Sequence, residues 1–253
     1  MIEIRQVYKS FEDKDVLIDI NARFDNGKTN LIIGQSGSGK TVLMKCVVGL
    51  LRPTSGQILY DGRDFVAMSK NEQKMLRREM GMIFQSAALF DSMTVLENVM
   101  FPLDMFSNDN LNDRIHRARQ CLDRVNLLDA QKKYPDEISG GMQKRVAIAR
   151  AIALNPRYLF CDEPNSGLDP KTSLVIDALI HDITVERNMT TLINTHDMNS
   201  VMGIGDNILF IRQGRQEWVG DSSMVMGATN QALTDFIFAS DLLRKAREAY
   251  LNN

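Results

Sequence analysis

The sequence predicts an α/β fold with a mostly parallel sheet, and three observations support this prediction. Short apolar runs that are typical of buried strands alternate with helical segments along much of the chain. One of these runs, Leu31 to Ile33, leads into a glycine-rich loop that an apolar helix follows. Between about residues 86 and 155 the strand patterns give way to helical ones. We therefore expect one sheet-centred core that is interrupted by a helical subdomain.

The first third of the chain is expected to begin with a β-rich layer. From Val16 to Phe24 apolar and polar residues largely alternate, which is the period of a half-buried strand, and this period places Leu17 on the polar face. The turn Asp25 to Gly27 follows. Gln57 to Tyr60, together with Asp61 and Gly62 after it, indicates a hairpin.

Capping patterns and apolar runs predict the remaining elements. A Ser or Thr followed three residues later by Glu can form a capping box that starts a helix, and the chain has this pattern at Ser69 and Thr94. Helices are expected after those two residues, at Val42–Leu51 and Leu111–Val125, and near Pro170 and Met198. Buried strands are expected at Met82–Phe84, Tyr158–Phe160, Thr191–Ile193 and Ile208–Ile211. Residues 1–222 would then form one domain, with its helical subdomain at about 86–155, and 223–253 a helical tail.

Composition excludes some classes of function. The 253 residues carry a formal net charge of -2, so no overall basic field favours a nucleic-acid partner. The three cysteines, Cys46, Cys121 and Cys161, lie in apolar segments and are expected to be reduced core residues of a cytosolic protein. The first residues lack the pattern of a signal peptide, and no apolar run approaches a membrane span. Any action on a membrane would therefore require a partner.

The loop after Leu31–Ile33 fits the phosphate-loop pattern G-x-x-x-x-G-K-[ST] at every fixed position. Glycines let the backbone curl so that its N–H groups point inward and form an anion site with the helix N-terminus. Lys40 would reach the β- and γ-phosphates, and Thr41 would bind Mg²⁺. The alternative is a glycine-rich turn with a stray lysine. The expected ATP-binding residues of the loop are Gly34, Ser36, Gly37, Ser38, Gly39, Lys40 and Thr41.

A second chemical signal is the apolar run Tyr158–Cys161, which ends in two carboxylates. Neighbouring side chains at a strand end diverge, so one carboxylate can hold Mg²⁺ while the other faces the γ-phosphate. We assign Asp162 to the metal and Glu163 to the attacking water as general base. The alternative is a strand end capped by two solvated acids.

The segment Ile138 to Arg145 opens an amphipathic helix. Ser139 and the amides of Gly140 and Gly141 would make a second anion site there. This segment closely resembles the signature motif of ATP-binding cassette (ABC) ATPases. The resemblance implies a P-loop NTPase cassette with an antiparallel β subdomain and a helical signature subdomain. It also implies a homodimer in which each ATP lies between one chain's phosphate loop and the other chain's signature. The alternative is a glycine-containing helix cap.

Further residues match the family in its order and imply further roles. Phe11 matches the aromatic residue that stacks on adenine, with Tyr8 as a possible substitute. Gln85 resembles the Q-loop glutamine, which contacts Mg²⁺ or the attacking water and senses the membrane partner. Asp169 resembles the D-loop residue that crosses the dimer interface, and His196 resembles the switch histidine that contacts the γ-phosphate.

Two residues depart from the usual motifs: Met142 replaces the glutamine of the signature, and Asn165 stands where Thr is common. The run from Ser139 to Met142, with the helix after it, resembles the MlaF-like cassettes of Mce/Mla phospholipid transporters. This resemblance implies membrane permease subunits, an Mce-domain lipid-binding protein and a small accessory subunit as partners. It places the chain in the cytoplasm, peripheral on the cytoplasmic face of the inner membrane.

Other interpretations remain open at this point. The Met-rich segment from Met80 to Met105 is either a groove for the permease or a core seam. The charged helix from Asp241 to Tyr250 is either solvated or docks onto the other cassette or an accessory subunit. For the whole chain, the alternatives are an importer cassette for another substrate such as an amino acid, a soluble non-transport ABC ATPase, and a simple nucleotide kinase.

Overall fold

Two sheets organise the fold in the computed structural model, which describes residues 1–12 and 14–252. The larger sheet has the strand order β10-β9-β3-β8-β7-β6. Its strands from β9 to β6 run parallel, and β10 pairs antiparallel with β9. The predicted α/β fold with a mostly parallel sheet is confirmed. The bounds are β3 Lys28–Ile33, β6 Met80–Ile83, β7 Tyr158–Asp162, β8 Thr190–Thr195, β9 Asn207–Arg212 and β10 Arg215–Gly220.

The smaller sheet is antiparallel, with the order β2-β1-β4-β5. Its strands are β1 Ile2–Phe11, β2 Lys14–Phe24, β4 Ser55–Tyr60 and β5 Arg63–Asp64. The predicted hairpin is present as the β4 and β5 pair. The prediction that Leu17 lies on the polar face is wrong, because Leu17 is fully buried. Ile18 and Asp19 oppose the single residue Tyr8, and Asp19 has a φ of 52°, so a β-bulge reverses the faces of the strand.

Helices cover the large sheet, and most begin at the predicted residues. Ser69 and Thr94 both form capping boxes. The first helix ends at Val47, earlier than the predicted Leu51. Gly49 explains this end, because it has a φ of 77° and a Cβ there would lie 2.4 Å from the Phe65 ring. The helices are α1 Lys40–Val47, α2 Lys70–Arg77, α3 Val95–Phe106, α4 Leu111–Arg124, α5 Gly140–Ala151, α6 Pro170–Glu186, α7 Met198–Ile204, α8 Ser222–Val225, α9 Gln231–Ile237 and α10 Asp241–Leu251, with short 3₁₀ turns at Leu128–Ala130 and Pro135–Glu137.

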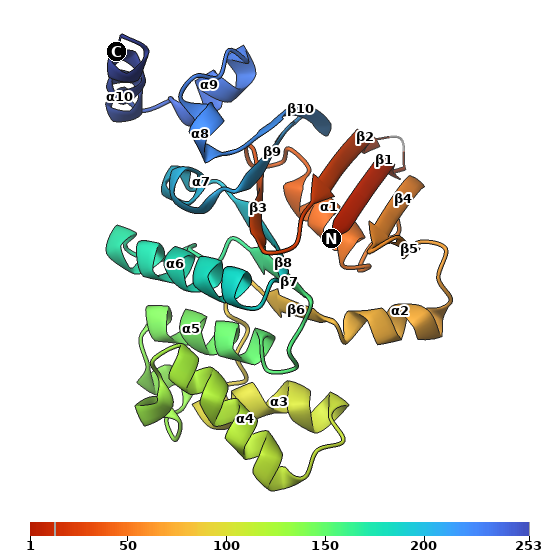
Figure 1. The fold of residues 1–253 in the computed structure, drawn as a ribbon, viewed down its shortest axis with the longest axis vertical. Coiled ribbons are helices and arrows are strands. Elements are labelled where there is room, and N and C mark those ends of the chain that lie inside the picture. The colour runs from red at the N-terminus through yellow and green to blue at the C-terminus, as the bar shows by residue number, and fades with distance from the viewer. Residues whose placement is uncertain (13, 253) are drawn as a thin grey trace.

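The core lies on both faces of the parallel sheet, and alternation along β3 links its two halves. Ile32 packs in a cluster with α1 and the antiparallel sheet. Leu31 and Ile33 point to the other face and join the cluster of α3 to α7. Figure 1 shows the corresponding layers, with the antiparallel sheet and α1 on one side and α6, α5 and the α3–α4 pair on the other. Cys46, Cys121 and Cys161 are buried free thiols in these clusters, as predicted.

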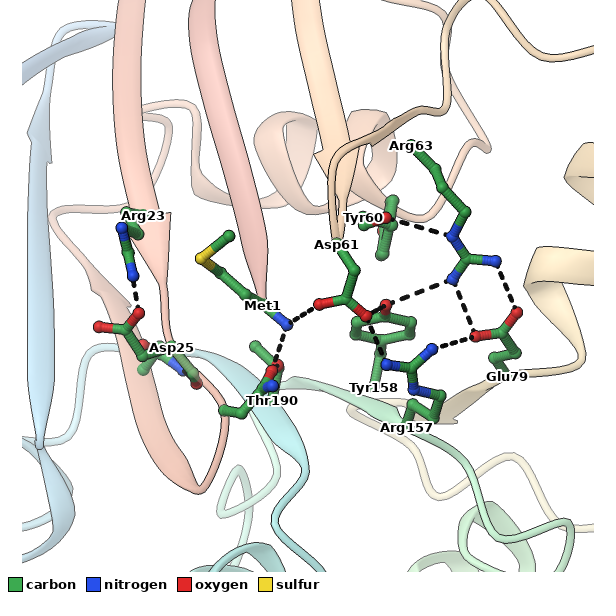
Figure 2. A network of polar contacts seen from close by, with 12 residues as sticks. Met1, Arg23, Asp25, Tyr60, Asp61, Arg63, Glu79, Arg157, Tyr158 and Thr190 are labelled. Carbon is green, nitrogen blue, oxygen red and sulfur yellow. Dashed lines mark hydrogen bonds and ion pairs between the residues drawn. The ribbon is translucent and has the colours of Figure 1, made fainter.

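A polar network joins the two sheets at the edge where β7 begins (Figure 2). Arg157 Nη2 and the Tyr158 hydroxyl each donate to Asp61 Oδ2 at 2.6 Å. Arg63 makes two parallel hydrogen bonds with Glu79, of 2.9 and 3.0 Å. The β4–β5 turn is thus tied to the starts of β6 and β7. The charged groups of the network are partly exposed, so the network orients the sheets more than it stabilises the fold.

The chain ends in helices that extend to one end of the molecule (Figure 1). Helix α9 is anchored by buried Leu233 and Ile237, and the Phe236 ring stacks on Phe210 with centroids 5.4 Å apart. Helix α10 buries no residue, and Leu242 is 79% exposed. Within the described residues, no helix combines the length and the apolar character needed to cross a membrane.

Candidate active site

The phosphate-loop residues connect β3 to α1, as the pattern predicts. Three glycines of the loop have positive φ: 148° at Gly34, 79° at Gly37 and 111° at Gly39. A Cβ at Gly34 would lie 2.2 Å from the Ile211 carbonyl oxygen, so only glycine fits there. Ser38 Oγ is buried and has no hydrogen-bond partner among the described residues. An unpaired hydroxyl beside the N-terminus of α1 fits a phosphate group as ligand.

Lys40 lies within this loop rather than on its surface, with 7% of its area exposed. Its Nζ donates to the carbonyl oxygens of Gly34 at 2.7 Å and Gln35 at 3.1 Å. Burial lowers the pKa of Lys40, and the nearby Glu163 and Asp162 carboxylates oppose that shift. Both acids stand at the carboxyl end of β7, which like β3 is a parallel neighbour of β8, so they lie at the same edge of the sheet as the loop.

Asp162 and Glu163 stand at the carboxyl end of β7. Asn194 Nδ2, at the end of neighbouring β8, donates to Asp162 Oδ1 at 3.0 Å. The Glu163 amide donates to the Asn194 carbonyl at 3.0 Å, and Glu163 has a φ of 49°. This left-handed backbone turns the second carboxylate away from the direction of the first. The sequence analysis did not single out Asn194; its only signal was that it is a polar residue directly after the expected buried strand Thr191–Ile193.

His196 and Gln85 approach the same loop from two sides. His196 Nδ1 is 2.8 Å from Glu163 Oε2, and the imidazole is 67% exposed. Gln85 Nε2 donates to Ser166 Oγ at 3.0 Å. The residues come from β6, β7 and β8, whose carboxyl ends meet at one edge of the sheet. This edge therefore gathers a carboxylate, an imidazole and an amide beside the phosphate loop.

The donor set at this edge also fits Mg²⁺. Oxygen ligands from one or two protein side chains, completed by phosphate and water, are what this ion prefers. Asp162 offers a carboxylate, Thr41 an exposed hydroxyl at the start of α1, and Gln85 an exposed amide oxygen. Among the described residues there is no group of three or more His, Cys, Asp or Glu side chains that could hold a metal ion. The side chains named above offer one carboxylate, one hydroxyl and one amide oxygen, so phosphate and water would have to complete the coordination of Mg²⁺.

The signature residues lie in a different cavity, of about 630 Å³. Ser139 caps α5, and its Oγ accepts from the Met142 amide at 3.3 Å. Asp169 caps α6 and lines the same cavity. Gly140 and Gly141 also line it, whereas the phosphate loop lines a separate cavity of about 350 Å³ with α9. The structure thus places Ser139–Met142 and Asp169 around one cavity, whereas the loop residues 35–38 of the same chain line the other.

Phe11 lies at the end of β1, with 43% of its area exposed. Lys9 Nζ lies 4.7 Å from the centre of its ring. Tyr8 is also partly exposed, at 36%. Both rings are exposed enough to stack on adenine, so the structure does not decide between Phe11 and Tyr8.

Comparison with known proteins identifies the family. The sequence model described as ABC transporter matches residues 17–166, from the β2 strand through the phosphate loop, signature helix and carboxylate pair. The chain belongs to the ABC transporter family. ABC cassettes are ATPases that bind ATP with Mg²⁺, and the chain carries this ATPase cassette.

Two curated ABC relatives cover most of the chain. The methionine import ATP-binding protein MetN of Photobacterium profundum is 43% identical over 218 residues, which are 85% of this chain and 63% of that protein. The probable ribonucleotide transport ATP-binding protein mkl of Mycobacterium leprae is 35% identical over 93% of this chain and 68% of its own length. The chain therefore spans less than two thirds of the first relative.

A solved ABC cassette shares most of the fold. The dimeric structure of the ATP-binding cassette MJ0796, in a post-hydrolysis state bound to ADP and Pi, matches with a TM-score of 0.78 and 31% identity. The match covers 88% of this chain and 99% of that chain. The predicted cassette architecture, with its antiparallel sheet and helical subdomain, is thus confirmed.

Proposed function

We propose that this chain is the ATP-binding and ATP-hydrolysing subunit of an ABC transporter and that two copies close around two Mg·ATP. The observation that carries the proposal is that the phosphate-loop residues 35–38 and Ser139 line two separate cavities. Each cavity offers donors for an anion, and a single triphosphate cannot use both in one chain. Head-to-tail packing of a second copy would complete each site, as the dimeric form of the related MJ0796 cassette supports.

Each residue of the candidate active site has a separate role in the proposed hydrolysis of ATP. The loop amides and Lys40 bind the β- and γ-phosphates. Thr41, Asp162 and Gln85 would hold Mg²⁺, which when bound would neutralise charge on the phosphate oxygens. Glu163 accepts a proton from the attacking water, and His196 holds the Glu163 carboxylate and contacts the γ-phosphate. Ser139 to Met142 and Asp169 contact the nucleotide held by the other copy.

A groove beside β6 supports a membrane permease as partner. It has a volume of about 550 Å³ and is lined by apolar and aromatic side chains, including Met80, Met82 and Phe90. Lys74, Arg77 and Arg78 add a basic rim, which favours a partner segment with apolar and acidic residues. Of the other methionines, Met100 is buried and Met105 is 59% exposed, so the Met-rich segment serves the core as well. Such a partner would hold the chain on the cytoplasmic face of the inner membrane.

For the cargo, we propose phospholipid moved across the cell envelope. The support is the signature run from Ser139 to Met142, which resembles that of MlaF-like cassettes. The partners would then include an Mce-domain protein and an accessory subunit. A second candidate is amino-acid import, which the 43% identity with a methionine import cassette favours. The two candidates share the ATPase and differ in the permease.

Purification of the chain with its membrane subunits tests the function. After detergent extraction, the chain should copurify with a permease, and the complex should hydrolyse ATP. Phospholipid in the complex, together with stimulation by phospholipid vesicles, would support the lipid proposal. Stimulation by methionine without bound phospholipid would favour the second candidate. Recovery of the chain free of any membrane protein, from cells that express it normally, would contradict the transport proposal.

A further inference from the structure

A buried polar cluster behind the carboxylate loop joins three elements. Asn165, in the loop after β7, donates from Nδ2 to Asp177 Oδ1 at 2.8 Å and to Ser200 Oγ at 3.2 Å. Ser200 Oγ donates in turn to Asp177 Oδ2 at 2.7 Å. Asp177 lies on α6 and Ser200 on α7, and these helices lie next to each other (Figure 1). The three side chains close a ring of hydrogen bonds.

The cluster is buried and holds a carboxylate without a cation. Asp177 is 3% exposed, Ser200 1% and Asn165 9%. Asp177 takes part in none of the ion pairs formed by the described residues. Burial raises the pKa of Asp177, and the hydrogen bonds from Ser200 and Asn165 oppose the rise. Burying a carboxylate that has only neutral hydrogen-bond donors lowers the stability of the fold, and apolar residues at these positions would be less destabilising.

The positions of these residues in the chain connect the cluster to catalysis. Asn165 follows Glu163 by two residues, and Ser200 lies on the first turn of the helix that follows His196. Glu163 has a left-handed backbone, which persists only where the surroundings fix it. The loop after it is closed by the Leu168 amide, which donates to the Asn165 carbonyl at 3.1 Å. The cluster thus fixes the segment that carries Glu163 against the segment that carries His196.

We propose that Asn165, Asp177 and Ser200 are positioning residues that hold Glu163 and His196 at their separation. The inference rests on the proposed catalytic roles of those two residues. Asp177 acts as the fixed acceptor: it is held by α6, and it orients the Asn165 amide on one side and the Ser200 hydroxyl on the other. Neither Asp177 nor Ser200 contacts the nucleotide in this arrangement. The cluster therefore affects turnover through the geometry of the Glu163 and His196 pair.

Thr184 provides a matched control, because it makes a comparable buried bond on the same helix. Its Oγ1 lies 2.6 Å from Thr191 Oγ1, and both residues are fully buried. Thr191 belongs to the start of β8, whereas the proposed active site lies beyond the end of that strand. Loss of the Thr184 hydroxyl should lower stability in the same way as loss of the Ser200 hydroxyl, without moving Glu163 or His196.

The test measures steady-state ATP hydrolysis, ATP affinity and thermal stability for Ser200→Ala, Asp177→Asn and Thr184→Val. We expect Ser200→Ala and Asp177→Asn to lower kcat by roughly 10- to 100-fold, since a displacement of about 1 Å can have that effect, with ATP affinity within about twofold. Thr184→Val should keep kcat while it lowers the melting temperature. In a Glu163→Gln background, Ser200→Ala should lower turnover no further, because residues that act as a unit are not additive.

Three results would contradict the proposed positioning role. Wild-type kcat in Ser200→Ala and Asp177→Asn, with Glu163→Gln inactive, would overturn the positioning role and leave the proposed function intact. Equal losses in Thr184→Val and Ser200→Ala at temperatures where both are folded would also overturn it, because the effect would then follow stability alone. Full turnover in Glu163→Gln itself would refute both the catalytic role of Glu163 and the inference that rests on it.

Discussion

His196 Nδ1 lies 2.8 Å from Glu163 Oε2, although the two residues belong to different strand ends. β7 and β8 are parallel neighbours, with Asp162 paired to Asn194, so the loops that follow them leave the sheet side by side. Glu163 keeps 18% of its side chain exposed, while His196 is mostly exposed. The partly buried Glu163 carboxylate thus faces an imidazole whose exposed ring has room to change its orientation. This arrangement suits the proposed roles, in which Glu163 is the base and His196 contacts the γ-phosphate.

Replacing Glu163 by Gln should lower kcat by roughly 10² to 10⁴, which is the range for loss of a general base, and should leave ATP binding intact. Phosphate release under saturating Mg·ATP measures the first quantity, and equilibrium titration with ATP the second. Asp182 on the same chain is a suitable control, because it is exposed on α6 away from the loop. Turnover near that of the wild type in Glu163→Gln would refute the assignment.

Lys40→Ala should abolish ATP binding at micromolar concentration, because it removes a charge-assisted contact with the phosphates. Lys45→Ala is the control, since Lys45 is exposed in the last turn of the same helix. Calorimetric titration with ATP compares the two. An unchanged affinity in Lys40→Ala would contradict our interpretation of the loop.

The affinity of the unmodified chain for ATP should fall at alkaline pH. Lys40 binds phosphate as a cation, and burial lowers its pKa below the 10.5 of an exposed lysine. The charge is therefore lost at a pH below 10.5, and the dissociation constant should rise as pH increases through that range. A titration series at constant ionic strength measures it; a constant affinity up to pH 10.5 would show that Lys40 keeps its proton in the free protein.

Gly34→Ala and Gly37→Ala should differ in severity. Both positions have positive φ, which strains any other residue by on the order of 1 kcal/mol or more. At Gly34 the new Cβ would also meet the Ile211 carbonyl oxygen at 2.2 Å, whereas at Gly37 nothing lies within 4 Å. Urea unfolding should show a larger loss for Gly34→Ala, and equal losses would mean that the loop can shift away from β9.

Phe11→Ala and Tyr8→Ala decide which ring stacks on adenine. Loss of a stacking ring typically costs about 1 to 3 kcal/mol, so the correct variant should weaken ATP binding by roughly tenfold or more. The other variant should bind as the wild type does. Titrations with ATP and with inorganic triphosphate separate the base from the phosphates: the affinity for triphosphate should not change in either variant. If both variants bind ATP normally, adenine stacks elsewhere.

Arg150→Ala should loosen the loop that links β6 to α3. Arg150 donates to the Ala88 and Ala87 carbonyls at 2.7 and 2.8 Å, and both alanines have positive φ. Amide hydrogen exchange should therefore rise over residues 87–90, and permease binding should weaken while ATP affinity stays the same. Arg145→Ala is the control, because Arg145 bonds the Val125 carbonyl within the helical subdomain. Unchanged exchange in Arg150→Ala would show that the loop is held by other contacts.

Local patterns in the sequence predicted most of the elements. The caps at Ser69 and Thr94 were predictable because a capping box is completed within four residues. The strand, loop and helix around Lys40 were predictable because the phosphate-loop pattern is also local in the sequence. The face on which Leu17 lies could not be predicted in this way. An alternating pattern assumes an unbroken strand, whereas the bulge opposite Tyr8 depends on how β2 pairs with β1. The end of α1 was also missed, since the Phe65 ring that approaches Gly49 lies far along the chain.

By itself, the sequence determined the chemistry of this protein: a loop that can cradle phosphates, a carboxylate pair at a strand end, and a second anion-binding motif at Ser139. Residue type and short spacing specify each of these, because their geometry is local. Only the tertiary structure decided which groups meet. The strand order β3-β8-β7-β6 brings His196 to Glu163 and Asn194 to Asp162, and the packing of α6 on α7 buries Asp177. These contacts join residues far apart in the chain, and only the packed sheet and helices fix their distances.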